Sequence, residues 1–201
     1  MVRTMVSQQE IMEKLKNMLS SHRWRHSVGV QKKAVELARR HEVDVHKAST
    51  AGLLHDCAKS LSEADMRKMV GKKDNEIEHW GQELLHAPAG AVLADQVFEV
   101  KDQEILSAIR KHTLGGPKMT DLEKVIYLAD FIEPGRVFPG RERIEKKAFE
   151  SLDEGILEAA KQTISYLVGR DKPIHLAVVE MRNQLLSSKL EREKVYGKPE
   201  A

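Results

Sequence analysis

Long segments rich in helix-forming residues dominate this chain and restrict it to a helical fold. Ala, Leu, Glu, Lys and Met make up most of these segments, and all five residue types have high helix propensity. Aromatic residues account for only 4% of the 201 residues, and the β-branched residues do not form the alternating runs that are typical of strands. The sequence therefore predicts an all-α protein.

Apolar residues at helical spacing and polar capping residues locate the helices. We expect helices over residues 7–19, 24–41, 45–55, 83–98, 103–112, 121–132, 143–168 and 174–190, with a break at residues 20–23, a short helix that opens at Ser62 and an interruption near Pro88. Asp44, Asp102 and Thr120 are the expected caps. No linker divides the chain, so we expect one domain over residues 1–201 that ends in a frayed tail of about residues 191–201.

Composition and charge exclude several classes of protein. The formal net charge of +2 provides no general attraction to nucleic acid or to a membrane surface. The chain has one cysteine, Cys57, so no disulfide forms within it, and we expect a reducing, cytoplasmic setting. The N-terminus has no signal-peptide core, and no apolar run reaches the ~18 residues of a membrane-spanning helix.

Polar residues interrupt the apolar faces of several predicted helices. The segment AGLLHDCAK, residues 51–59, ends a small apolar run with the adjacent pair His55 and Asp56. In DLEKVIYLADFIE, Asp130 lies four residues after Ile126, so its carboxylate faces the core. A buried carboxylate costs several kcal/mol unless it is paired or binds a metal. For Asp130 alone, a salt bridge or a helix-cap contact is the simpler explanation.

Histidines occur where the predicted helices begin and end. His112 follows Ile109 on a buried helix face, and by itself it would more often be a core histidine bonded to a carbonyl than a ligand. Side chains at helix ends can converge, and the set in question is His26, His55, Asp56, His86, His112 and Asp130. Imidazole with carboxylate suits divalent Fe, Mn, Co or Zn, whereas a structural zinc site would use paired thiolates.

The remaining histidines and the cysteine have lesser expected roles. We expect surface or capping positions for His22, His41, His46 and His175. His79 lies seven residues before His86 and is expected at most to support it. Cys57 directly follows the His-Asp pair and is expected to be small packing material.

The order of these residues resembles a known pattern. His26, the His55-Asp56 pair and Asp130 follow the H…HD…D order of the HD-domain metal-dependent phosphohydrolases. The segments RHSVGVQKKAVELA, KASTAGLLHDCAK, HAPAGAVLA and ILSAIRKHTLGGPKMTDLEKVIYLADFIEPGR are similar to the YqeK-type branch of this family, which consists of bacterial symmetrical diadenosine tetraphosphate hydrolases. The likeness covers roughly residues 20–185, the expected core of a single HD domain.

The resemblance implies an all-helical HD-domain bundle with a metal site between helices. Iron is the implied metal, with Mn, Co or Zn as substitutes and one or two ions, and the implied ligands are His26, His55, Asp56 and Asp130. His86 and His112 would either complete a second metal position or bind substrate phosphates. The implied substrate contacts are Arg23, His26, Asp56, His86, His112, Thr113, Arg136, Pro173, Ile174 and His175.

The expected chemistry is hydrolysis by a metal-activated water. Asp56 can ligate the metal and orient or deprotonate that water, and His112 can donate a proton to the leaving phosphate or ligate a second metal. Lys59 can stabilise phosphate charge, or it is a capping or solvated lysine. Arg23 and Arg136 can each bind phosphate oxygens through two N–H groups, with a solvated surface arginine as the alternative.

The resemblance also implies the substrate and the assembly. Diadenosine tetraphosphate would be cut at its central phosphate bridge to give two ADP, by a protein that forms a homodimer. Two alternatives stay open: another HD nucleotide phosphohydrolase, such as a nucleotidase or a guanosine-tetraphosphate hydrolase, and a nucleotide-binding protein without turnover. Basic and acidic residues are interleaved along the chain, so we expect no nucleic-acid partner and no membrane partner.

Overall fold

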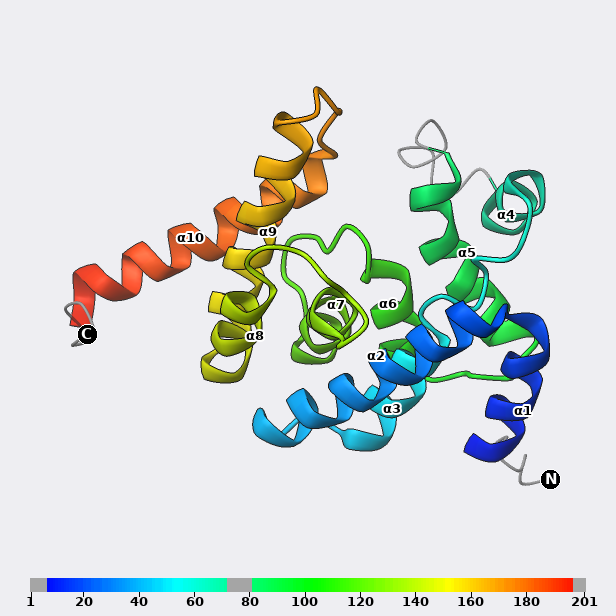
Figure 1. Cartoon of the computed structure of the whole chain (residues 1–201). Coiled ribbons are helices and arrows are strands. Elements are labelled where there is room, and N and C mark those ends of the chain that lie inside the picture. The colour runs from blue at the N-terminus through cyan, green and yellow to red at the C-terminus, as the bar shows by residue number, and fades with distance from the viewer. Residues whose placement is uncertain (1–6, 72–80, 197–201) are drawn as a thin grey trace.

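The computed structural model describes residues 7–71 and 81–196, and these residues form helices and loops without any strand. Ten helices lie within them (Figure 1). They are α1 (Gln8–Met18), α2 (Ser21–Arg40), α3 (Val45–Leu54), α4 (Glu63–Val70), α5 (Gln82–Gln96), α6 (Gln103–Lys111), α7 (Asp121–Ile132), α8 (Arg141–Glu150), α9 (Leu152–Val168) and α10 (Leu176–Tyr196). The prediction of an all-α fold is confirmed.

Side-chain caps begin several helices at the predicted places. The carboxylates of Asp44 and Asp102 accept hydrogen bonds from backbone N–H groups in the first turns of α3 and α6. Thr120 forms a capping box with Glu123 at the start of α7, and Ser62 caps α4. These caps satisfy N–H groups that have no partner inside the helix. The short-range chemistry of the sequence is therefore enough to locate these helix starts.

Of two predicted interruptions in the first half of the chain, the break at residues 20–23 is shorter than expected and the interruption near Pro88 is wrong. Helix α2 begins at Ser21, because the Ser20 side chain accepts a hydrogen bond from the Arg23 N–H and caps the helix. Arg23 thus lies inside the helix and not in a break before it. Helix α5 continues through Pro88, which lies among buried residues of the same helix. A proline inside a helix loses a backbone hydrogen bond, and the burial of the surrounding residues outweighs that loss.

The end of the chain also differs from the prediction. The expected single helix over residues 143–168 is two helices, α8 and α9, separated at Ser151 by an extended backbone with φ −158° and ψ 131°. Helix formers on both sides conceal this turn from a propensity argument. Helix α10 runs to Tyr196, so residues 191–196 are helical and not frayed. The rest of the expected tail, residues 197–201, and His79 lie outside the described residues.

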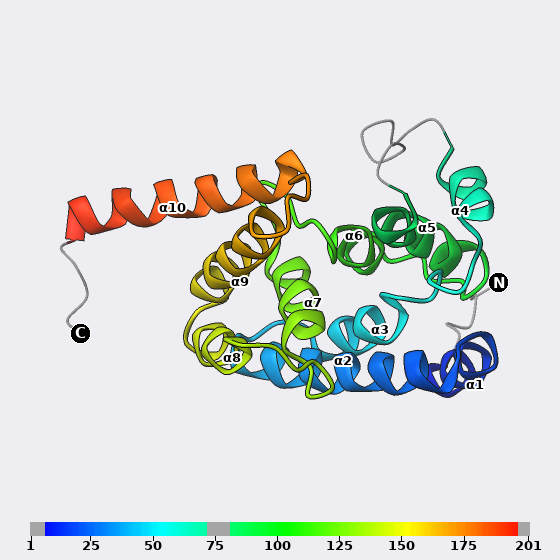
Figure 2. The same ribbon diagram turned by 45° about the horizontal axis from the view of Figure 1, so that its top comes forward.

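The central helices pack so that several of their ends meet. Helix α2 packs on α3 and α7, and α6 packs on α3, α5 and α7. The α8–α9 pair lies against α7, and α10 packs on α9 and extends away from the central helices (Figures 1 and 2). Within the described part of the chain, no helix combines the length and apolar character needed to cross a membrane.

A continuous hydrophobic core fills the space between these helices. Leu37, Leu54 and Ile126 are among its fully buried members. Buried histidine and aspartate side chains, including His55 and Asp56, interrupt this apolar interior at the place where the helix ends meet. A polar group that is buried in this way requires a compensating partner.

Candidate metal centre

Six side chains converge between the central helices. They are His26 from α2, His55 and Asp56 at the end of α3, His86 from α5, His112 at the end of α6 and Asp130 from the last turn of α7. We refer to them as the His-Asp cluster. In three overlapping groups of three, each residue offers a ligand atom that lies within 4.8 Å of the others. The structure therefore brings together all six residues that the sequence pattern singled out.

Two of the histidines are held by the helices that they terminate. His55 Nδ1 lies 2.8 Å from the Gly52 carbonyl, and His112 Nδ1 lies 2.7 Å from the Ile109 carbonyl. The last carbonyls of a helix have no partner within it, so each ring donates its Nδ1–H to one of them. This hydrogen bond leaves Nε2 of each ring unprotonated and directed into the cluster.

The other two histidines also direct Nε2 into the cluster. His26 Nδ1 lies 3.1 Å from a Glu133 carboxylate oxygen, and His26 Nε2 lies 3.0 Å from Asp130 Oδ1. His86 Nε2 lies 3.2 Å from Asp56 Oδ1, while its Nδ1 lies 3.4 Å from the Gln82 carbonyl of its own helix and 3.1 Å from Lys59 Nζ. Four imidazoles and two carboxylates therefore share one small volume.

The spacing of the Nε2 atoms is that of ligands on a shared cation. His26 and His55 have their Nε2 atoms 3.1 Å apart, and so do His86 and His112. Two unprotonated nitrogens at this distance repel each other unless a proton or a cation lies between them. With metal–nitrogen bonds of about 2.0–2.1 Å, two imidazoles on one ion would be separated by ~3.0–3.4 Å. The donor set therefore fits a divalent metal.

Asp56 divides the cluster into two groups. Its Oδ1 faces His86 and His112, at 3.2 and 3.7 Å from their Nε2 atoms. Its Oδ2 faces His26 and His55, at 3.9 Å from each Nε2. We call Asp56, His86 and His112 the inner group, and His26, His55, Asp56 and Asp130 the outer group. One carboxylate is thus placed to serve two cation positions.

The electrostatic environment keeps most of these side chains in ligand form. Burial lowers the pKa of His55 to about 4 and also lowers the pKa of His86, so both rings stay neutral. Burial opposes ionisation of Asp56 and Asp130, but the neighbouring imidazoles, His55 beside Asp56 and His26 beside Asp130, lower both pKa values. Burial also opposes a charge on His26, yet its hydrogen bond to Asp130 raises the pKa of that ring. Neutral imidazoles and ionised carboxylates are the forms that bind metals.

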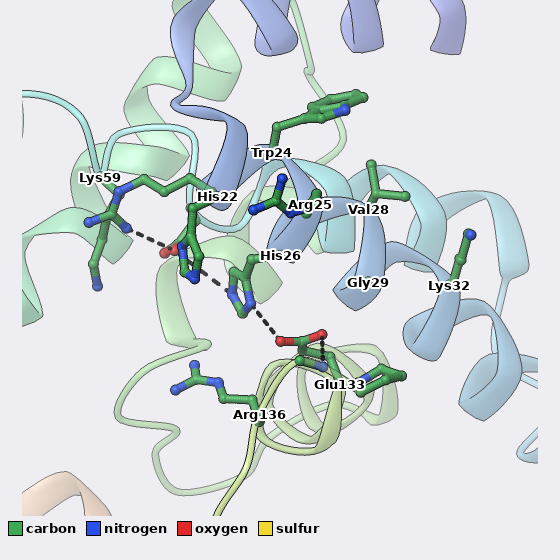
Figure 3. A pocket seen from close by; sticks show the side chains of 14 residues that line it. His22, Trp24, Arg25, His26, Val28, Gly29, Lys32, Lys59, Glu133 and Arg136 are labelled. Atoms are coloured by element: carbon green, nitrogen blue, oxygen red, sulfur yellow. Dashed lines mark hydrogen bonds and ion pairs between the residues drawn. The ribbon is translucent and has the colours of Figure 1, made fainter.

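A cavity of about 830 Å³ opens onto His26 and Asp56 of the outer group. Five cationic side chains line this cavity: Arg23, Arg25, Lys32, Lys59 and Arg136. Three of them, Arg23, Lys59 and Arg136, contact residues of the cluster, and Lys59 and Arg136 are labelled in Figure 3. Arg23 lies 3.6 Å from Asp56 Oδ2, and Arg136 lies 2.5 Å from Asp130 Oδ1. A cavity with a metal-ligating floor and a cationic wall suits a substrate that carries several negative charges.

Other residues with predicted substrate contacts lie elsewhere. Thr113 and residues 173–175 do not contribute to the lining of this cavity. His175 is buried, and its Nδ1 accepts a hydrogen bond from the Ala177 N–H at the start of α10. It therefore has the expected capping position, as does His41 at the end of α2, whose Nε2 lies 2.7 Å from the Ala148 carbonyl.

Cys57 has the packing role that the sequence predicts. Its side chain is 1% exposed, and its thiol donates to the Gly90 carbonyl over 3.4 Å. Burial, together with the charge of Asp56, raises the pKa of the thiol, so it stays protonated and does not join the cluster.

The sequence argument missed part of the site. Glu133 is 5% exposed and contacts His26 from the end of α7, three residues after Asp130. Helical spacing from Asp130 was an available signal, because residues three apart share a helix face. Trp24 and Lys32 on α2 also line the cavity (Figure 3), and they flank His26 within two turns of the same helix.

Comparison with known proteins gives one family and consistent relatives. The HD domain family model matches residues 23–135. The chain is 39% identical over 170 residues to a symmetrical bis(5′-nucleosyl)-tetraphosphatase of Halalkalibacterium halodurans, covering 84% of this chain and 91% of the relative. It is 39% identical over 172 residues to the protein of the same name from Bacillus subtilis, covering 84% of this chain and 92% of the relative.

A solved structure shares the whole fold. It is an HD superfamily hydrolase from Clostridium acetobutylicum, described as involved in NAD metabolism. The two chains superpose with a TM-score of 0.85 at 39% identity, over 92% of this chain and 99% of the other. The similarity therefore extends over the helices that build the cluster and beyond them.

Proposed function

The chain belongs to the HD domain family, and we propose that it is a symmetrical bis(5′-nucleosyl)-tetraphosphatase that hydrolyses diadenosine tetraphosphate to two ADP. The observation that carries this proposal is that two members of the His-Asp cluster, His26 and Asp56, line a cavity together with several cationic side chains. A bound metal would lower the pKa of a water molecule and draw charge from the phosphoryl oxygens. Phosphoryl transfer depends mainly on positioning and on charge neutralisation, and this arrangement offers both.

The donor set fits a divalent metal, and we propose iron, with Mn, Co or Zn as substitutes. The outer group would hold the ion that faces the cavity, and the inner group would hold a second ion. Asp56 supports two positions because its two oxygens face different histidine pairs. His112 is 2% exposed and does not line the cavity, which favours a ligand role for it over proton donation to the leaving phosphate.

The three cavity cations that contact the cluster, Arg23, Lys59 and Arg136, would bind the phosphates. Arg136 is held in place because its Nε donates to the Asp130 carbonyl over 3.0 Å while its Nη2 contacts the carboxylate. Its other N–H groups can then bind phosphate oxygens in a fixed orientation. Burial lowers the pKa of Lys59, and phosphate charge would stabilise its ammonium form. Arg23 would bind beside Asp56, which can orient or deprotonate the attacking water.

A symmetrical cut requires that one ADP half be held with its terminal phosphorus at the outer group. The cavity extends from His26 along α2 to Trp24 and Lys32, and it has room for substrate atoms beyond the reacting phosphate. We further propose that the protein works in the cytoplasm as a homodimer. Thr113 and residues 173–175 stay proposed nucleotide contacts and would have to act outside the lining described above.

Product analysis tests the proposal. Purified protein would be loaded with Fe²⁺, Mn²⁺ or Co²⁺, incubated with diadenosine tetraphosphate and analysed by anion-exchange chromatography. We expect ADP as the only nucleotide product. Equal amounts of AMP and ATP, or a predominance of orthophosphate or pyrophosphate, would refute symmetrical cleavage and favour another HD phosphohydrolase. Nucleotide-dependent thermal stabilisation without any product would favour a binding protein.

A further inference from the structure

Glu133 contacts the Nδ1 of His26, whereas the Nδ1 atoms of His55, His86 and His112 lie near carbonyls of their own helices. His55 and His112 end their helices, so each finds a free backbone carbonyl for its Nδ1. His26 lies inside α2, where the carbonyls are already bonded to N–H groups four residues later. The partner of its Nδ1 is a side chain from another helix: Nδ1 lies 3.1 Å from Glu133 Oε1.

We propose that Glu133 is a positioning residue that holds the His26 ring with its Nε2 directed at the outer group. The two ring nitrogens are on opposite sides of an imidazole, so Glu133 itself is not placed to be a ligand. A carboxylate that accepts the Nδ1–H fixes the orientation of a metal-binding histidine and makes its other nitrogen a stronger donor. This inference rests on the proposed function only in requiring that the outer group bind a metal.

The end of α7 fixes the Glu133 side chain before any ion arrives. Glu133 Oε2 accepts a hydrogen bond of 2.8 Å from the Gly135 N–H. Pro134 follows directly and favours the extended backbone that Glu133 has, with φ −56° and ψ 148°. The Glu133 carbonyl accepts from the Arg136 N–H over 3.0 Å, which closes this turn.

Two glycines make room for the carboxylate. A Cβ on Gly29, one turn after His26 on α2, would lie 2.6 Å from Glu133 Oε2. A Cβ on Gly135 would lie 2.7 Å from Glu133 Oε1. Both distances are too short for real atoms, so any side chain at either position would displace the carboxylate. A glycine inside a helix costs about 1 kcal/mol relative to alanine, and at Gly29 the space that it leaves lets Glu133 reach His26.

Metal titration of the metal-free protein tests this role. The affinity for Co²⁺ would be measured by competition with a chromophoric chelator, and the visible spectrum of bound Co²⁺ would report its ligands. Glu133→Ala should bind Co²⁺ about 10–100-fold more weakly, with a changed spectrum. Glu133→Gln should lie between Glu133→Ala and the wild type, because its amide oxygen can still accept the Nδ1–H. A purely structural role would alter the melting temperature of both variants and leave affinity and spectrum unchanged.

Glu145→Gln is the matched control. Glu145 on α8 also contacts α2, through Lys33 at 2.8 Å, and it pairs with Arg141 of its own helix at 2.9 Å, without touching the cluster. We expect it to lower stability and to leave Co²⁺ affinity at the wild-type value. Wild-type affinity and spectrum in Glu133→Ala would overturn the proposal.

Gly29→Ala gives a second test that keeps the carboxylate and moves it. We expect weaker Co²⁺ binding here as well. Gly155→Ala introduces an equally close contact, 2.7 Å to Ala148 Cα, between α8 and α9, and should leave the affinity unchanged. Wild-type affinity in Gly29→Ala would overturn the role of the glycine pair. The titrations contain no nucleotide, so a wild-type protein that binds Co²⁺ and yields no ADP would refute the proposed substrate alone.

Discussion

The inner and outer groups of the cluster contain the same kinds of side chain in different surroundings. His86 and His112 of the inner group are 1% and 2% exposed. In the outer group, the side chains of His26 and Asp130 are 14% and 16% exposed and lie close to the cations of the cavity. The Nδ1 atoms of both inner rings lie near carbonyls of their own helices, and that of His86 also lies 3.1 Å from Lys59 Nζ, whereas the His26 Nδ1 contacts the Glu133 carboxylate.

Because their surroundings differ, we expect the ions at the inner and outer groups to have different roles. A buried position surrounded by backbone acceptors suits an ion that stays in place and orders the helix ends. A position that faces a cavity with Arg23, Lys59 and Arg136 suits an ion that contacts the substrate. Asp56 belongs to both groups, so we expect it to couple them.

The largest effect should follow from removing the residue that the two groups share. Asp56→Ala should lose metal from both positions and lower kcat by at least ~10³-fold, because the water loses its activation. Metal content of the purified protein and turnover of diadenosine tetraphosphate would be measured together. Asp65→Ala, at an exposed position on α4, is the control. Full metal content in Asp56→Ala would contradict the ligand role.

Single histidine variants should separate the two groups. His26→Ala should weaken outer metal binding about 10–100-fold and reduce turnover in proportion, since this ion faces the substrate. His86→Ala should lower the metal-to-protein ratio while the Michaelis constant stays near the wild-type value, because His86 does not line the cavity. Elemental analysis and steady-state kinetics would be compared for both. Identical losses in the two variants would argue for one shared ion.

The cations of the outer side should affect substrate binding more than metal binding. Arg136→Ala should keep its metal and raise the Michaelis constant about 10-fold, which corresponds to the loss of a charge-assisted hydrogen bond to phosphate. The control is Arg67→Ala, because Arg67 is paired with Glu63 on its own helix, α4, and does not line the cavity. An unchanged Michaelis constant would remove Arg136 from the substrate site.

The smallest expected effect is on the pH dependence of stability. The pKa of His55 is about 4 in the folded metal-free protein, against about 6.5 when unfolded. Between these values the unfolded chain binds more protons, so His55 lowers the free energy of unfolding as pH falls from about 6.5 toward 4. His26 has a raised pKa and opposes this change, because its contribution is present below the unfolded pKa and is lost as pH rises.

The net change is the excess of the His55 contribution over the opposing His26 contribution. Urea unfolding of the metal-free protein at a series of pH values would measure it. His55→Gln should flatten the curve in this window, and His46→Gln, at an exposed position, should not. A curve that keeps its slope in His55→Gln would contradict the assignment.

Short-range sequence patterns predict most helix boundaries of this protein and the direction of several site residues. Helix formers, apolar spacing and caps such as Asp44 and Thr120 predict most helix boundaries, because these interactions join residues only a few positions apart. The same spacing shows that Asp130 and His112 face inward, and the HD pair marks the end of α3. The sequence did not predict the turn at Ser151 or the continuous helix at Pro88, because packing between helices determines both features.

Long-range contacts decided the rest of the site. His26 and Glu133 are 107 residues apart, and their contact depends on how α2 crosses the end of α7. The division of the Asp56 oxygens between two histidine pairs depends likewise on where four helix ends meet. A local pattern gives the direction in which a side chain leaves its own helix. The partner that it reaches depends on the packing of the whole core, because helix-to-helix distances result from the sum of many weak contacts.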